Sequence, residues 1–271
     1  MKDTAKYYLE KYRKAKAERM QFEELYEECY DYALPQRAGF HYETKGQRRD
    51  DKIFDETAVV GVQEFASRLQ SGLVPNFARW ADFIAGSEMA EEDADEVNNE
   101  LDKVTEYIFE ILQNSNFSQE VHESFLDLAV GTACLIVEEG DAINPVRFNA
   151  IPLPQLVLES GPDDKIDHVY RQREVRCSDI TIIYPKAELA PEMINMMKNN
   201  PDAKTKILEV VCRIYDKPNV EKYGFFVIDI DRQKMLFMEN YEGVGSNPFV
   251  CFRWSKAAGE TYGRGPLVNA L

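Results

Sequence analysis

The sequence lacks most of the residue patterns with which enzymes hold metals, nucleotides or nucleophiles. Its three histidines have no cysteine, histidine or carboxylate at the spacing of a metal-ligand pair; His122 has Glu123 beside it, but adjacent helical residues point apart. Neither GxxxxGK[ST] nor GxGxxG occurs, and no serine has the flanking glycines of a nucleophile elbow. We therefore predict no catalytic residue, no metal ligand and no cofactor.

Paired cysteines and long apolar runs are also missing. The five cysteines are an odd number, lie far apart and form no CxxC pair, which favours reduced thiols in an intracellular protein. The longest nearly apolar run, Leu128 to Val137, is too short to cross a bilayer. The opening residues contain no apolar core of the signal-peptide type.

Acidic residues outnumber basic ones, 48 to 32, and give a net charge of −16. An average surface this acidic repels phosphates and excludes tight nucleic-acid binding, although it suits a passage through which DNA slides. The charge is uneven, because ten acidic residues and one lysine lie between Glu88 and Glu110, whereas seven basic residues lie between Lys2 and Arg19. Such a subunit can be complementary to a copy of itself, although a solvated helix face explains the acidic run equally well.

The first half of the chain predicts helices. Residues 3–32 contain no glycine or proline, and the pattern stops at Leu34-Pro35. Apolar residues also recur at helical spacing within 55–73, 93–113 and 117–130, with Asp55 as a candidate N-cap. In the third helix the predicted apolar stripe is Val97, Leu101, Val104, Ile108, Ile111 and Leu112.

From Thr132 the pattern changes to short β-type runs separated by turn residues. The predicted strands are 133–138, 146–151, 156–159, 166–176, 206–215, 223–230, 234–240 and 249–254, with helix formers at 191–199. A helical half followed by a β-rich half is an α+β pattern, and the absence of alternating βα units argues against a Rossmann or barrel enzyme. One mixed domain, or a helical layer packed on a β-rich part, both fit this pattern.

Two motifs are specific. The first runs from FDETA at 54–58 through LQSGLVP at 69–75 to Arg79-Trp80, and predicts a capped helix, a Gly/Pro stop and an aromatic segment packing back on the helix. The second combines PFVCFRW at 248–254 with the final residues 259–271. Here two glycines bracket Arg264, so the backbone needs unusual dihedrals or a close approach, and Pro266 suits the first residue of a helix.

In this order and at this separation, the motifs resemble those of the portal (head-to-tail connector) proteins of short-tailed bacteriophages. The resemblance covers essentially the whole chain. The residues that carry it, and that we expect to serve assembly, are Arg79, Trp80, Arg253, Trp254, Tyr262, Gly263, Arg264, Gly265 and Pro266. It implies a portal wing with a helical part over 1–131, a β-rich part over 132–260 and, over 261–271, the start of the connection to the first stem helix, where this sequence ends.

The resemblance implies a structural, non-enzymatic subunit of a ring, typically twelvefold in the full-length protein, at one vertex of the capsid. DNA is packaged and ejected through such a ring without sequence-specific binding, and the tail attaches to it. The implied partners are further copies of the chain, capsid and scaffolding proteins, and terminase and tail adaptor through regions this sequence does not contain. The implied location is the virion, after assembly in the host cytoplasm.

Two other functions remain as alternatives. A carboxylate-dependent hydrolase would place clustered, partly buried carboxylates in a deep pocket. A DNA-binding module would need a contiguous basic face, which only the first helix and the loop from Lys45 to Lys52 could supply. For the portal hypothesis, we expect the Arg264 guanidinium to be held by a carboxylate or by carbonyls. We also expect residues 1–271 alone to form a monomer or a weak, salt-sensitive oligomer.

Overall fold

The computed structural model describes residues 5–37, 39–40, 53–88, 90–216 and 220–270. The first half of the chain is helical, as predicted. Its helices are α1 (Ala5–Ala33), α2 (Thr57–Leu73), α3 (Glu91–Asn114) and α4 (Phe117–Val130). No helix in these ranges is both long and apolar enough to cross a membrane.

The second half contains all eight predicted strands, which begin directly after Gly131. The strands are β1 (Thr132–Glu139), β2 (Val146–Ala150), β3 (Leu156–Ser160), β4 (Ile166–Arg176), β5 (Lys204–Arg213), β6 (Lys222–Asp229), β7 (Lys234–Glu242) and β8 (Phe249–Arg253). The helical segments between and after them are η1 (Leu153–Gln155), α5 (Cys177–Ile183), α6 (Pro191–Asn199) and α7 (Pro266–Ala270). The α+β prediction is therefore confirmed.

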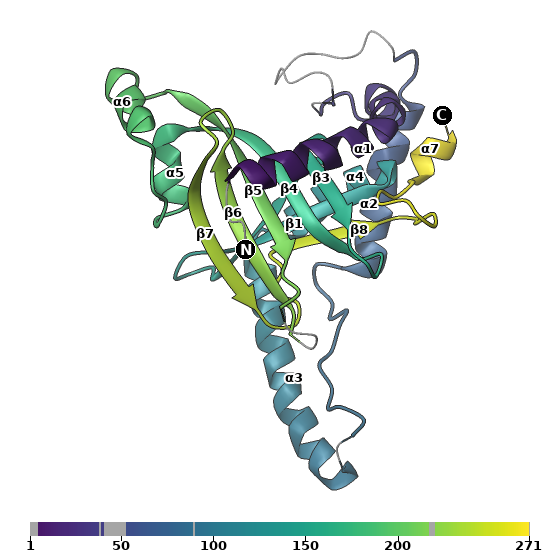
Figure 1. Ribbon diagram of the computed structural model, residues 1–271. Helices are drawn as coiled ribbons and strands as arrows, with labels where there is room; N and C mark the ends of the chain where they lie inside the picture. Colours follow the sequence, from purple (N-terminus) through teal and green to yellow (C-terminus); the bar gives the residue numbers. More distant parts are fainter. Residues whose placement is uncertain (1–4, 38, 41–52, 89, 217–219, 271) are drawn as a thin grey trace.

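The strands form two antiparallel sheets, one ordered β2-β1-β8 and the other β3-β4-β5-β6-β7. Helix α1 crosses one face of the five-stranded sheet (Figure 1), where Tyr8 stacks on Phe226 with 4.5 Å between ring centroids. The main core lies on the other side of that sheet and combines residues of α1, α2, α4 and both sheets. Helix α4 therefore lies buried between the sheets and the other helices, with Val130 fully covered.

Helix α3 extends out of the body, with the segment before it running alongside (Figure 1). Its buried side chains, within the part of the helix that is described, are Thr105 and Phe109. The predicted buried stripe is wrong at Val104, which is 47% exposed. The physical reason is that α3 packs along most of its length against one extended segment, and such a segment covers only a narrow strip of a helix.

Two local predictions also need correction. Helix α2 begins at Thr57 rather than Asp55, and the Asp55 carboxylate accepts the Thr57 N–H at 2.8 Å from just outside the helix. Helix α5 was not predicted, because the run from Ile180 to Ile183 is β-branched and reads as a strand. Its first residue is fixed by tertiary contacts, since the Cys177 N–H donates to Ala203 O at 2.8 Å and the Cys177 side chain is fully buried.

Candidate functional site

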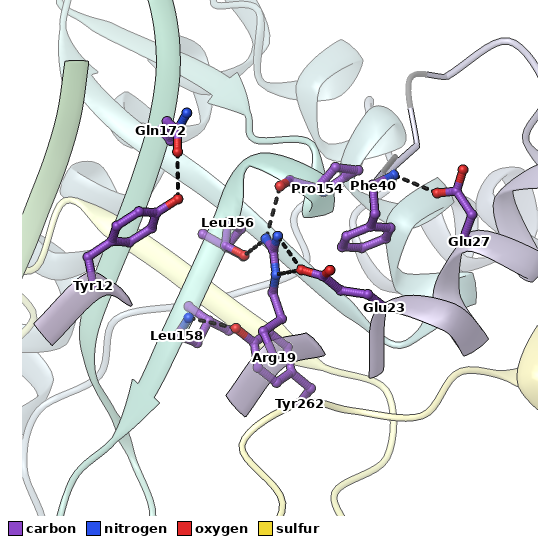
Figure 2. A network of polar contacts seen from close by, with 10 residues as sticks. All are labelled: Tyr12, Arg19, Glu23, Glu27, Phe40, Pro154, Leu156, Leu158, Gln172 and Tyr262. Atoms are coloured by element: carbon purple, nitrogen blue, oxygen red, sulfur yellow. Dashed lines mark hydrogen bonds and ion pairs between the residues drawn. The ribbon is translucent and has the colours of Figure 1, made fainter. Parts of the chain in front are cut away.

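The final motif, residues 260–266, folds into a tightly held segment that we call the C-terminal anchor. Its central residue, Tyr262, is 2% exposed and lies against α1 and β3. The Tyr262 hydroxyl accepts the backbone N–H of Leu158 at 2.8 Å (Figure 2). Since β3 is an edge strand, this bond satisfies a donor that no neighbouring strand reaches. Burial raises the pKa of Tyr262 above its ordinary value and keeps the hydroxyl protonated.

Helix α1 covers the same edge strand with a buried arginine. The Arg19 guanidinium donates to Pro154 O at 2.9 Å and to Leu156 O at 2.7 Å (Figure 2). Its charge is balanced by Glu23, one helical turn further on, at 2.6 Å. The β3 edge is thus closed by α1 and the C-terminal anchor, which are far apart in the sequence.

The two glycines of the anchor permit a close approach to the end of α4. A Cβ atom on Gly265 would lie 2.0 Å from Ala129 O, and one on Gly263 would lie 2.3 Å from Gly131 O. At this approach the Gly265 N–H donates to Val130 O at 2.9 Å, and the Gly263 N–H donates to Thr132 Oγ1 at 2.8 Å. The glycines are therefore required by contact between two backbones, which is one of the two reasons predicted from the sequence.

Two backbone carbonyl groups of the anchor also accept hydrogen bonds from side chains. Tyr26 of α1 donates its hydroxyl to Gly263 O at 2.5 Å. On the other side, Arg253 at the end of β8 donates to Thr261 O at 3.0 Å. These bonds join the anchor to the three-stranded sheet as well as to α1, so Pro266 begins α7 from a fixed position.

Arg264 is held as predicted, by a carboxylate. Its Nη2 lies 2.6 Å from Glu260 Oε1 and its Nε lies 3.0 Å from Oε2 of the same side chain, so the pair is bidentate. The pair lowers the pKa of Glu260. The Arg264 N–H donates to Ser255 O at 3.0 Å, while its side chain stays half exposed. Trp254 lies beside this turn, edge-on to Phe65 of α2 at 5.1 Å.

The other motif residues lie along the protruding α3, with Arg79 beside its middle and Trp80 nearer the body. Arg79 pairs with Asp102 at 2.5 Å and with Asp82, and so ties the extended segment to α3. The Trp80 ring packs on Phe109 and on Phe117 at the start of α4. The 14 residues of α4 span about 20 Å, so the structure places this pair and the C-terminal anchor at opposite ends of one helix rather than together.

The structure contains a buried polar cluster that the sequence pattern did not predict. The Tyr30 hydroxyl donates to Asp127 Oδ1 at 2.5 Å, and Arg37 Nη1 lies 2.7 Å from the same oxygen. Burial raises the pKa of Asp127, and the Arg37 charge opposes that rise. An aspartate within the apolar face of 117–130 was the one available signal. The cluster lies in the core, where it joins α1 to α4.

The described residues contain no group of three or more side chains that could hold a metal ion. His122 Nδ1 contacts Gln70 Oε1 at 3.1 Å, whereas His41 and the basic loop at Lys45 to Lys52 lie outside the described residues. Two hollows, of about 730 and 310 Å³, each have one carboxylate among their described lining residues, Glu192 and Glu123. The paired carboxylates that a hydrolase would need are thus not found in either hollow.

Comparison with known families gives one match. Over residues 5–271 the chain matches the family described as "Bacteriophage head to tail connecting protein". The matched range contains both motifs and therefore the C-terminal anchor. Comparison with curated proteins found no match.

Proposed function

Because the chain belongs to the bacteriophage head-to-tail connecting protein family, we propose that it is a subunit of the portal ring at one vertex of the capsid. As a member of that family, it is a structural phage protein that connects head and tail. In our proposal, DNA enters and leaves the head through the ring, which has twelve copies of the subunit. Assembly takes place in the host cytoplasm, next to scaffolding and capsid proteins, and terminase and tail adaptor bind the ring in turn.

The observation that carries the proposal is the family match over residues 5–271. The C-terminal anchor supports it, because a helix that leaves the body in a fixed direction suits a part that must line up with its neighbours. Tyr262 and the two glycines fix the start of α7 against α1, β3 and α4. We propose that α7 leads from the wing toward the channel and that the anchor sets its angle.

The charge also suits this function. DNA passing through a ring must not be held, and a chain of net charge −16 displaces few of the counterions that surround DNA phosphates, so it gains little binding free energy from their release. Apart from the buried Arg19 and the half-buried Lys11, the described basic residues of α1 are exposed on the outer side of that helix. In our proposal this side faces another protein rather than DNA.

The test is a phage in which this gene carries an amber codon. In a host without a suppressor, we expect heads to assemble but to remain empty of DNA and without tails, because both steps pass through the connector. Supplying the wild-type chain from a plasmid should restore filled, tailed particles. DNA-filled heads with attached tails in the absence of the chain would show that the proposed function is wrong.

A further inference from the structure

One part of the structure leaves large apolar side chains uncovered. We call it the arm: residues 75–88 and 90–114, which extend from the body in Figure 1. Phe77 is 95% exposed, Ile84 is 77% exposed and Tyr107 is 63% exposed. Exposed aromatic and aliphatic groups gathered on one projecting element are typical of a protein interface.

The outer side of the arm is also acidic. Glu96, Glu100, Tyr107 and Glu110 recur at helical spacing along α3, so they share one side of the helix. Of these carboxylates, Glu100 pairs with Lys103. Glu96 and Glu110 form no ion pair with any other described residue. The arm thus offers unpaired negative charge next to an exposed aromatic ring.

A surface of opposite character lies on the outer side of α1. Lys6, Arg13 and Lys14 are exposed there and form no ion pair within the described ranges. Two large apolar side chains, Tyr7 and Met20, are exposed on the same helix. Figure 1 shows α1 lying across the sheet while α3 extends away from it, so the two surfaces of one chain point in different directions.

We propose that the arm of one copy docks on the outer side of α1 in a second copy. Glu96 and Glu110 then meet the cations of α1, and Tyr107, which lies between them along α3, packs among the exposed side chains of α1. The charge complementarity identifies the occupant, because the acidic arm repels phosphates and therefore nucleic acid and anionic membranes. The proposal rests on the ring proposed above and names the contact that closes it.

The difference between the two surfaces determines the kind of assembly. A contact between unlike patches is heterologous, so each copy has a free arm and a free α1 for two different neighbours. Repetition of such a contact generates a closed ring where the rotation closes, whereas a two-fold dimer would use one patch twice. Because the charged groups are exposed, salt weakens the contact.

The experiment reverses the charge of each surface separately. One variant carries Glu96→Lys and Glu110→Lys on the arm, and the other carries Arg13→Glu and Lys14→Glu on α1. Self-association of the full chain is measured by sedimentation velocity at low salt. We expect each variant alone to associate at least about tenfold more weakly than the wild type, since like charges then face each other.

Mixing the two variants gives the decisive result. The basic arm of the first then meets the acidic α1 of the second, and the unchanged arm of the second meets the unchanged α1 of the first. We expect the mixture to recover wild-type association. A control with the same charge change at exposed sites elsewhere, Glu139→Lys with Glu188→Lys, should stay within about twofold of the wild type.

Three outcomes would overturn the docking proposal. The first is a wild-type chain that stays monomeric at every concentration reached. The second is unchanged association of both variants. The third is weaker self-association of the arm variant while the α1 variant associates like the wild type, which would indicate that the arm binds a basic surface other than α1. None of these bears on the amber-phage experiment, so failure of the docking contact and failure of the connector function are distinguishable.

Discussion

Substitution of Gly265 by alanine tests the close approach on which the C-terminal anchor depends. The added Cβ would lie 2.0 Å from Ala129 O, 2.5 Å from Ala129 C and 2.6 Å from Val130 C. All three are backbone atoms at the end of a buried helix, so no side chain can turn aside to make room. Either the anchor or the last turn of α4 must move.

The expected cost follows from two contributions. Overpacking of a filled core costs about 1–3 kcal/mol. A shift of the anchor also breaks the bond from the Gly265 N–H to Val130 O, 2.9 Å long, and a buried group left unpaired costs about 1–3 kcal/mol. We therefore expect Gly265→Ala to lower the free energy of unfolding by about 2–6 kcal/mol.

Gly61 provides a matched control for the same chemical change. It lies within α2, and a Cβ there meets nothing within 4 Å. Gly61→Ala should raise the free energy of unfolding by about 0.5–1 kcal/mol, because alanine is the better helix former. Urea denaturation of both variants measures the two effects. A Gly265→Ala protein as stable as the wild type would refute the close approach.

Two further predictions concern buried groups of the same region. Burial raises the pKa of Tyr26 and Tyr262 above the ordinary value of 10.0 and that of Cys29 above 9.0, so the unfolded chain loses these protons first. Stability measured by urea denaturation should therefore fall as the pH rises past about 9, and a level profile from about pH 8 to about pH 11 would contradict this. Arg19→Met should cost about 3–5 kcal/mol, because it leaves Glu23 buried and unpaired. The double variant with Glu23→Leu should recover part of that loss in the same assay, and no recovery would show that the unpaired charge is not the cause.

The sequence predicted where helices and strands lie along the chain better than it predicted which of them pack against each other. The eight strands were predicted because each short run of β-type residues is bounded by turn residues, as at Gly161 to Asp163 between β3 and β4. Helix α5 was not predicted because the run from Ile180 to Ile183 has strand propensity, whereas the helix is held by its two buried residues, Cys177 and Ile180, which pack into the core. Local patterns cannot reveal such a tertiary effect.

In the C-terminal anchor, too, contacts between residues close in sequence were predictable and contacts between distant residues were not. The glycines flanking Arg264 indicated a close approach, and Glu260, one helical turn away in sequence, was within reach of a local argument. The distant partners of the anchor could not be predicted by a local argument, since Tyr26 and Gly263 are 237 residues apart. Nothing in a single sequence specifies which tyrosine of α1 binds a carbonyl that distant. The sequence also could not predict that the arm is exposed, because apolar residues recur at the same helical spacing whether or not the rest of the same chain covers them.

The most direct test of the connector function is a cryo-electron microscopy map of the tail vertex in particles of the phage that encodes this chain. We expect a rotationally symmetric ring between head and tail, in which each subunit fits the two sheets and α1 to α4 as described. A map of that vertex into which no copy of this fold fits, obtained from DNA-filled and tailed particles, would contradict it.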